Sequence, residues 1–187
     1  MIRAYCPDDA AAVRTVVSDA FGAEGARVAD LAEALRATHG RAELVAEEDG
    51  DVVGHVLLSR SWIDARPALV EVLVLSPLSV APAHQRRGTG TALVAAAIDA
   101  ARALGVPAVF LEGDPAYYSA RGFAPATPRG FTRPSVRIPE AAFQVVLLPA
   151  HEPWMSGALV YGEPFWSYDG VGLRDPHLAS IEQAFES

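Results

Sequence analysis

Ten residues at positions 84–93, HQRRGTGTAL, bring two arginines, two glycines and two threonines into one short segment. The segment follows an apolar run typical of a strand and precedes an alanine-rich run typical of a long helix. Glycines let the backbone turn sharply, and the free N–H groups at the start of a helix attract anions. The sequence therefore predicts an anion-binding turn between a strand and a helix.

Three families of loop hold phosphate groups at such a turn, and two of them do not fit. A Walker loop needs a lysine followed by serine or threonine after its last glycine, whereas Gly90 is followed by Thr91 and the segment has no lysine. A dinucleotide-binding fingerprint needs a third glycine or an alanine where this sequence has Leu93. The third family fits in full, because QRRGTG at 85–90 resembles the Q/R-x-x-G-x-G/A loop of N-acetyltransferases, which binds the pyrophosphate of coenzyme A.

A second segment strengthens this resemblance. GDPAYYSARGF at 113–123 is similar to the motif that follows the fifth strand of the same family and typically ends Tyr-x-x-x-Gly-Phe. Residues 120–121 depart from it, because an arginine-aromatic pair commonly stands there. The resemblance covers most of the chain and points to the GNAT superfamily of acyl-CoA-dependent N-acetyltransferases, with the GDPAYY segment similar to a large bacterial group of predicted members.

The resemblance implies roles for the loop and for the strand end before it. The backbone amides of residues 85–91 would point at the pyrophosphate, with the dipole of the following helix behind them. The strand end at 78–80 would pair with the pantetheine arm of acetyl-CoA, as an added strand does. Without the resemblance, these segments predict an ordinary glycine-rich helix start, solvated arginines and a core strand. The implied cofactor-binding residues are Leu78, Ser79, Val80, Gln85, Arg86, Arg87, Gly88, Thr89, Gly90 and Thr91.

Tyr118 is the implied catalytic residue, because it occupies the tyrosine position of the Tyr-x-x-x-Gly-Phe pattern. In the family this tyrosine can protonate the departing thiolate of coenzyme A. Tyr117 is its neighbour and a possible confounder, and an aromatic residue on a short helix can also simply belong to the core.

The general base stays open at the level of sequence. Glu71, Glu112 and His84 are the ionisable residues near the relevant strands, and a chain of water molecules could serve instead. Asp114 is better explained as the N-cap of a short helix that begins at Pro115.

Apolar periodicity and turn signals predict the elements that position these residues. Asp49-Gly50 indicates an antiparallel hairpin, and Gly40 suits a helix C-cap. The Ser76-Pro77 pair predicts a bulge or a break in pairing, and residues 125–139 read as a loop. The predicted order is a strand at 2–5, helices at 7–21 and 28–39, strands at 43–47, 51–63 and 68–80, a helix at 88–104, a strand at 106–111, a short helix at 114–121, strands at 143–148 and 158–161, and a terminal helix after Asp175-Pro176.

Strand, loop, helix and strand follow one another over residues 72–111, which predicts a βαβ unit with parallel strands. The expected fold class is therefore α/β, and the resemblance implies the GNAT fold, a mixed and mostly antiparallel sheet with a central parallel βαβ unit flanked by helices. We expect one domain over 1–187, with 150–187 a C-terminal extension packed on it. Trp154, Phe165 and Trp166 in this extension are expected in the core or at an interface, with the acceptor cleft as the alternative.

Composition limits the classes of function. A chain of 187 residues with 51% hydrophobic and 20% charged residues is globular, and no apolar run reaches membrane-spanning length. The net charge of −8 argues against nucleic acid and anionic membrane as partners. One cysteine and five scattered histidines predict neither a disulfide framework nor a metal site, and the N-terminus shows no signal-peptide pattern, so we expect a cytoplasmic protein.

These observations together predict an N-acetyltransferase that moves an acetyl group from acetyl-CoA to a primary amine by direct attack in a ternary complex. The acceptor is a small molecule or a peptide amine, and a homodimer is possible. The alternative is a non-catalytic acyl-CoA-binding or regulatory module, which would keep the glycine loop without needing Tyr118. Phosphoryl transfer is disfavoured by the missing lysine and by the lack of a downstream magnesium carboxylate.

Overall fold

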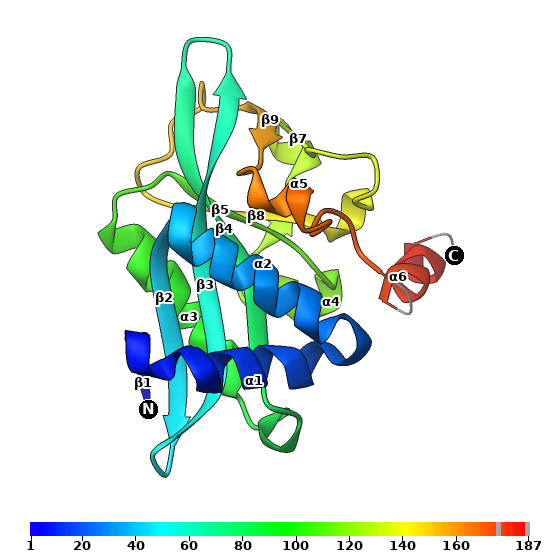
Figure 1. Ribbon diagram of the computed structural model, residues 1–187. Coiled ribbons are helices and arrows are strands. Elements are labelled where there is room, and N and C mark those ends of the chain that lie inside the picture. Colours follow the sequence, from blue (N-terminus) through cyan, green and yellow to red (C-terminus); the bar gives the residue numbers. More distant parts are fainter. Residues whose placement is uncertain (175–176, 186–187) are drawn as a thin grey trace. The chain divides into compact units, whose positions relative to one another are not determined.

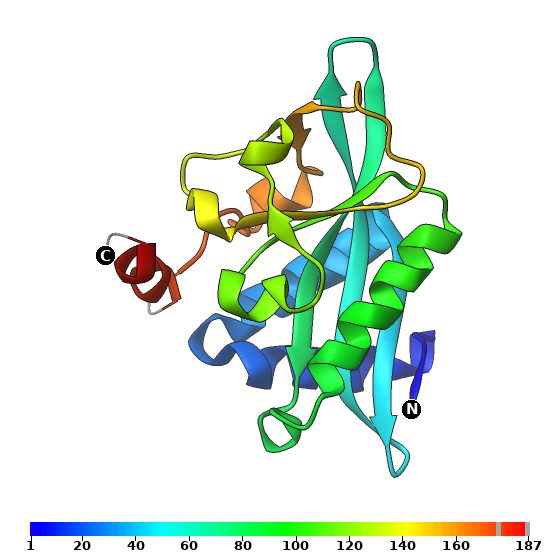
Figure 2. The same cartoon turned by 180° about the vertical axis from the view of Figure 1, so that it is seen from behind.

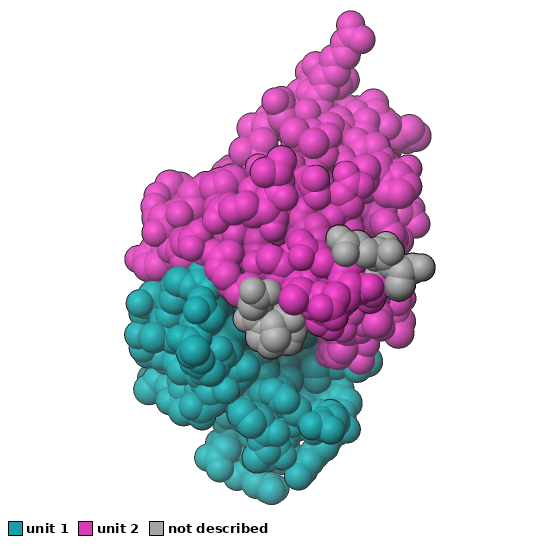
Figure 3. Space-filling model, turned by 90° about the vertical axis from the view of Figure 1, so that its right-hand side faces the viewer, with its two compact units in different colours: residues 1–59, 75–104 teal, residues 60–74, 105–187 magenta. Residues whose placement is uncertain are grey.

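The computed structural model describes residues 1–174 and 177–185 (Figure 1). The chain forms two compact units, which Figure 3 shows in two colours. Unit 1 consists of residues 1–59 and 75–104, and unit 2 of residues 60–74 and 105–187. The expectation of a single domain with an extension at 150–187 stays a prediction, and each unit is described by itself.

Unit 1 contains strands with helices on both faces. Strands β1 and β2 pair antiparallel, as do β2 and the first part of β3. Helices α1 and α2 lie in front of these strands in Figure 1, and α3 lies in front of them in Figure 2. The elements of this unit are β1 (Ile2–Ala4), α1 (Ala10–Phe21), α2 (Gly25–Thr38), β2 (Gly40–Glu48), β3 (Asp51–Ala65, continuing into unit 2), the end of β4 (Leu69–Val80) and α3 (Thr89–Ala103), with 3₁₀ turns at Pro7–Asp9, Gly22–Glu24 and Pro82–His84.

The hairpin between β2 and β3 has the turn that the sequence predicts. Asp49 and Gly50 have φ values of 54° and 91°, and two positive φ angles are typical of a type I′ turn, which matches the twist of the strands that it joins. The apolar stripes of α1 and α2 pack over β2 in a core cluster of Val13, Val17, Val28, Ala29 and Val45.

Unit 2 is mixed and mostly antiparallel, with a parallel pair of strands. Strand β5 pairs parallel with β4 through Leu73 and Val109, and antiparallel with β8. Strand β8 also pairs antiparallel with β6, while β9 pairs antiparallel with β3 and parallel with β7. The further elements are β5 (Ala108–Glu112), α4 (Pro115–Ser119), β6 (Ala124–Pro125), β7 (Phe131–Thr132), β8 (Phe143–Leu147), β9 (Gly157–Val160), α5 (Pro164–Ser167) and α6 (His177–Phe185).

Aromatic packing forms the centre of unit 2. The ring of Phe110 on β5 lies edge-on to Phe131 at 5.0 Å and stacks on Phe143 at 5.7 Å, and all three side chains are fully buried. Phe165 is buried as predicted, whereas Trp154 and Trp166 are 40% and 45% exposed and are not core residues. These contacts hold β5, whose carboxyl end leads into the segment that carries Tyr118.

The α/β class, the antiparallel hairpin and the parallel β4–β5 pair predicted from the sequence are confirmed. Three local expectations are wrong. Gly40 begins β2 instead of capping α2, and α4 ends at Ser119 because a turn with a positive φ at Gly122 follows. A cis bond joins Ser76 and Pro77 within β4, and the pairing of β4 with β5 ends at Val74, before this bond. The expected loop at 125–139 contains β7 and a 3₁₀ turn, and the predicted helix start at Asp175-Pro176 lies outside the described residues. Within the described part of the chain, no helix is long and apolar enough to cross a membrane.

Candidate active site

The segment between β4 and α3 has the backbone of an anion-binding turn. Gln85 is extended, Arg86 has a φ of 59°, and Gly88 has a φ of 91° at the N-cap of α3. Alternation of ordinary and left-handed residues turns successive N–H groups to one side, the arrangement known as a nest. Gly90 lies in the first turn of α3 with an ordinary helical backbone, so of the two motif glycines Gly88 is the one that needs a positive φ.

The N-terminus of α3 is left open to an anion. Within the described chain no side chain caps it, and its first turn contains no acidic residue. The free N–H groups of a first helical turn and the helix dipole both favour negative charge at this point. Arg86, Arg87, Gly88 and Thr91 are exposed, and Thr89 and Gly90 are partly exposed, so the whole turn can be reached from solvent.

The end of β4 is tied to this turn by one side chain. The amide Nε2 of Gln85 donates to the carbonyl oxygen of Val80 at 3.0 Å, which fixes the beginning of the loop against the strand. Leu78 and Val80 are partly exposed, whereas Ser79 is 2% exposed and its hydroxyl has no hydrogen-bond partner among the described residues. The residues predicted to bind coenzyme A therefore form one continuous segment in unit 1.

Tyr118 lies in unit 2, in the short helix α4 after β5. Its ring packs on the backbone of Gly113, where an added Cβ would lie 2.4 Å from Cε2 of the tyrosine, and edge-on against Phe123 at 5.8 Å. Burial, and then the neighbouring Tyr117, raise the pKa of Tyr118 above its ordinary value. A hydroxyl in this state stays protonated at neutral pH, as a general acid must.

Helix α4 is positioned by the cap that the sequence predicts. The side chain of Asp114 accepts a hydrogen bond from the N–H of Ala116 at 2.8 Å, and Pro115 occupies the first helical position. The rings of Tyr117 and Tyr118 meet edge-on at 4.9 Å, but Tyr117 also has the guanidinium of Arg121 3.5 Å from the centre of its ring, whereas Tyr118 packs on Gly113 and Phe123. The two adjacent tyrosines are therefore distinguishable by their contacts.

Glu112, one of the three candidate bases, ends β5 and is held at both carboxylate oxygens. Oε1 accepts from the hydroxyl of Tyr161 at 2.8 Å, and Oε2 accepts from the N–H of Gly172 at 2.9 Å. Burial raises the pKa of Glu112 to about 7, although both hydrogen bonds act to lower it. The hydrogen bond between Tyr161 and Glu112 cannot be predicted from the sequence, because the two residues lie 49 positions apart and Tyr161 belongs to no motif.

The other two candidate bases lie in different settings. Nδ1 of His84 lies 2.8 Å from Oε2 of Glu48 in unit 1, so the imidazole is engaged by a surface carboxylate. Glu71 lies on β4 in unit 2 and is partly exposed. Glu112 is the one of the three whose carboxylate is known to be held at both oxygens.

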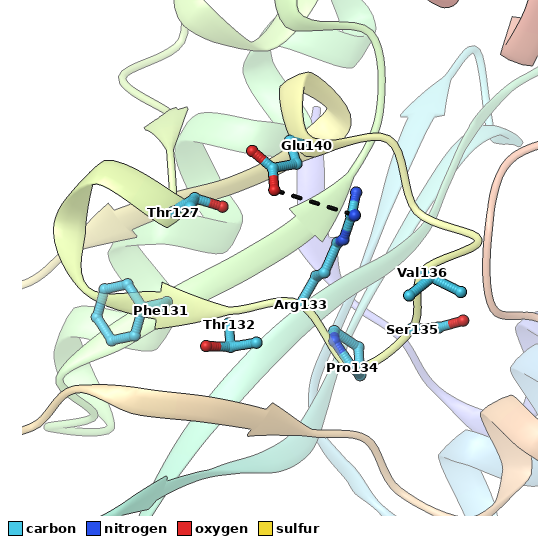
Figure 4. Close-up of a pocket in the computed structure, with 8 residues that line it drawn as sticks. All are labelled: Thr127, Phe131, Thr132, Arg133, Pro134, Ser135, Val136 and Glu140. Carbon is cyan, nitrogen blue, oxygen red and sulfur yellow. Dashed lines mark ion pairs between the residues drawn. The ribbon is translucent and has the colours of Figure 1, made fainter.

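A cavity of about 380 Å³ lies in unit 2, beside the chain from β7 to the 3₁₀ turn at Glu140–Ala142 (Figure 4). Arg133 and Glu140 face each other across it at 3.9 Å, which is longer than a hydrogen bond. The cavity also has room for a small polar group, and its lining belongs to the proline- and arginine-rich segment in which the sequence shows no motif. The lining residues are Thr127, Phe131, Thr132, Arg133, Pro134, Ser135, Val136 and Glu140.

Among residues 1–174 and 177–185, no group of three or more histidine, cysteine, aspartate or glutamate side chains could hold a metal ion.

Comparison with known proteins identifies the family. Residues 11–131 match the acetyltransferase (GNAT) family. The chain is 31% identical to the uncharacterized N-acetyltransferase YjhQ of Escherichia coli K12, over 83% of this chain and 88% of that protein. Among solved structures it is similar to the GNAT family N-acetyltransferase YhbS of Escherichia coli in complex with CoA, with a TM-score of 0.78 and 29% identity, over 88% of this chain and 91% of the other. It is also similar to a GNAT family acetyltransferase of Brucella melitensis in complex with acetyl-CoA, with a TM-score of 0.71 and 32% identity, over 88% and 97% of the two chains.

The chain belongs to the GNAT acetyltransferase family and has its fold. It is an acetyl-CoA-dependent N-acetyltransferase, with acetyl-CoA as the cosubstrate. The loop at 85–91 and the segment around Tyr118 both lie within the matched residues 11–131. The family indicated by these two short motifs is therefore the family that the whole matched region shows.

Proposed function

We propose that the protein transfers the acetyl group of acetyl-CoA to a primary amine by direct attack, with both substrates bound at once. The observation that carries this proposal is the open, uncapped N-terminus of α3 behind the left-handed backbone of Arg86 and Gly88. Such a turn supplies backbone N–H groups and a positive helix dipole to a pyrophosphate. Two similar proteins are in complex with CoA or acetyl-CoA in their solved structures, which supports coenzyme A as the ligand here.

The proposed roles follow from the chemistry of thioester aminolysis. The loop at 85–91 holds the pyrophosphate, and the edge of β4 at 78–80 pairs with the amides of the pantetheine arm. An N–H group near Val80 stabilises the oxyanion that forms when the amine attacks. Tyr118 donates its proton to the departing thiolate, in keeping with its raised pKa.

The acidic surface favours a cationic acceptor, because a net charge of −8 attracts ammonium groups. A small molecule, a peptide N-terminus and a lysine side chain all carry such a group. The cavity with Arg133 and Glu140 offers one place where parts of an acceptor other than its amine could bind.

The experiment that tests the proposal is a screen for acetyl-CoA consumption against a panel of amines that includes polyamines, amino sugars, peptide N-termini and lysine peptides. Release of free thiol and a matching acetylated product are expected with at least one amine. Acetyl-CoA binding without turnover on any amine would favour a non-catalytic acyl-CoA-binding module instead.

A further inference from the structure

We infer that the cavity beside β7 binds a small monocarboxylate through the guanidinium of Arg133, and that the carboxylate of Glu140 competes for the same guanidinium. The inference concerns binding alone and goes beyond the proposed function, so its test needs no acetyl transfer. It gives a ligand class to the segment between β7 and the 3₁₀ turn at Glu140–Ala142.

The segment that forms the cavity is basic, although the chain is acidic. Residues 115–139 contain four arginines and no aspartate or glutamate, whereas the whole chain has a net charge of −8. Of these four arginines, Arg133 is the one that lines the cavity. A local positive charge attracts anions, so the cavity favours a negatively charged ligand.

The guanidinium of Arg133 is held in position and still has donors to offer. Its Nη1 donates to the carbonyl oxygen of Ile138, a fully buried residue, at 2.5 Å. A guanidinium has five N–H donors, and Arg133 forms no second hydrogen bond within residues 1–174 and 177–185. The remaining donors lie in a planar fork, which matches the two oxygens of a carboxylate.

Glu140 is a weak partner for this guanidinium. Its Oε1 lies 3.9 Å from Nη2 of Arg133, which is longer than a hydrogen bond, and its side chain is 64% exposed (Figure 4). An exposed pair of this kind contributes little to stability. A ligand carboxylate at ordinary hydrogen-bond distance would therefore gain charge-assisted hydrogen bonds that Glu140 does not make.

The rest of the lining suits a small ligand with an apolar part. Thr127 and Thr132 contribute hydroxyl groups, and Pro134 and Val136 contribute apolar surface (Figure 4). The volume of about 380 Å³ lies near the lower end of the range found for ligand sites. A compact carboxylate with a short aliphatic or aromatic part fits this combination.

The charges favour a monoanion over a phosphate group. One guanidinium neutralises one negative charge, and Arg133 is the only arginine in the lining. The second negative charge of a phosphate monoester would face the carboxylate of Glu140, and like charges at short range repel each other. We therefore expect a carboxylate to bind more tightly than a phosphate monoester with the same apolar part.

The test is a titration of the full-length protein followed by NMR chemical shifts, with benzoate and isobutyrate as probes. Their uncharged amides and phenyl phosphate serve as controls. Both carboxylates should give saturable shifts at the backbone N–H groups of Thr132, Ser135 and Val136, with affinities at least about tenfold higher than those of the amides. No saturable shift at these residues with either carboxylate, equal affinity for benzoate and benzamide, or tighter binding of phenyl phosphate than of benzoate would overturn the inference.

Variants test the two charged residues separately. Arg133→Gln should weaken benzoate binding at least about tenfold, and Arg133→Lys should bind benzoate with intermediate affinity, because an ammonium keeps the charge without the planar fork. Arg129→Gln is the matched control and should leave the affinity unchanged, because Arg129 is exposed and lies outside the lining. Glu140→Gln should tighten benzoate binding by roughly two- to fivefold, since it removes the competing carboxylate.

Thermal unfolding of each variant shows whether it folds as the wild type does. The inference is overturned if Arg133→Gln folds and keeps the wild-type affinity, if Arg129→Gln loses as much affinity as Arg133→Gln, or if Glu140→Gln binds benzoate more weakly than the wild type. The last result would mean that Glu140 attracts part of the ligand instead of competing with it.

Steady-state assays then distinguish two sources of the carboxylate. If it belongs to the acceptor, Arg133→Gln should raise KM for an amine that carries a carboxylate and have a smaller effect on KM for the corresponding amide. If it belongs to a separate ligand, benzoate should change the kcat/KM of the wild type for an amine that has no carboxylate. No turnover by the wild type on any amine would overturn the proposed function, and the titration would still decide the inference.

Discussion

Gly88 is a residue on which the shape of the proposed coenzyme A loop depends. Its φ of 91° lies in a region that β-branched residues adopt only with strain. An added Cβ would meet no protein atom within 4 Å, so a substitution acts through the backbone and through the space that a phosphate would occupy.

We therefore expect Gly88→Val to weaken acetyl-CoA binding more than tenfold, measured by isothermal titration calorimetry, because backbone strain of roughly 1–3 kcal/mol would change the nest. Gly105→Val is the matched control. Gly105 follows the other end of α3 with a φ of 72° and equally open surroundings, so it should lower stability to a similar extent and leave acetyl-CoA affinity unchanged. Equal acetyl-CoA affinities of Gly88→Val and wild type would contradict the assignment of this loop to the binding site.

A second prediction at this scale concerns Tyr118→Phe. The ring can still pack on Gly113 and Phe123, so folding and acetyl-CoA affinity should barely change, whereas loss of the proton donor should lower kcat by roughly 10²-fold. Tyr117→Phe should be nearly silent in the same steady-state assay, because its ring face is occupied by Arg121. Two variants with the same intact kcat would rule out the general-acid role.

At the scale of elements, helix α4 has only five residues, so its N-cap matters more than in a long helix. Asp114→Ala removes the hydrogen bond to Ala116 and should cost about 1 kcal/mol of stability, which is a typical value for loss of an N-cap. The helix carries Tyr118, so kcat should fall while acetyl-CoA affinity stays the same. Asp114→Asn keeps an acceptor oxygen and should retain both stability and kcat. An equal loss of kcat in Asp114→Asn and Asp114→Ala would instead indicate that the charge of Asp114 matters.

Elements with a local signal could be predicted from the sequence. The Asp49-Gly50 hairpin, the Asp114-Pro115 helix start and the glycine turn before α3 each depend on residues within a few positions of one another. The sequence did not predict α5, β7 or the early end of α4, because each is short and fixed by contacts within its unit instead of by periodicity.

The same distinction holds for the candidate site, where residues in a local motif could be predicted and contacts between distant residues could not. The loop at 85–91 and Tyr118 were predicted, since each belongs to one contiguous motif. The hydrogen-bond partners of Glu112 could not be predicted, because Tyr161 and Gly172 lie 49 and 60 residues away and meet it only in the fold.

At the scale of the whole molecule, Glu112 should make the free energy of unfolding depend on pH. Its folded pKa of about 7 exceeds the ordinary value of 4.5, so between these values the folded state binds more protons than the unfolded state. Stability contributed by this group is therefore present below pH 4.5 and is lost as the pH rises through 7, by an amount on the order of 3 kcal/mol.

Glu112→Gln should flatten this dependence, which urea unfolding of both proteins between pH 4.5 and 8 would show. Glu43 has the opposite effect on the pH dependence of stability. Burial raises its pKa, but hydrogen bonds from His55 and Arg36 outweigh burial and lower it, so its contribution is lost as the pH falls. The difference between wild type and Glu112→Gln isolates the first effect, and parallel profiles for the two proteins would contradict the assignment.

The last prediction concerns metal dependence. The sequence has no cluster of metal-ligand spacing, and thioester aminolysis by the proposed route needs only proton transfer and N–H donors. Dialysis against EDTA should therefore leave kcat and acetyl-CoA affinity unchanged. Activity that disappeared on dialysis and returned with a single divalent metal would count against the proposed mechanism.

The two units are interleaved along the chain, because it passes from one to the other after residues 59, 74 and 104. A gene fragment encoding residues 105–187 would lack residues 60–74, and with them one of the two strands that pair with β5 and one of the two that pair with β9. We therefore expect both strands to be less stable in such a fragment, and no single cut of the gene yields both units intact. Fusion, truncation and split-reporter designs should therefore keep both units within one uninterrupted chain.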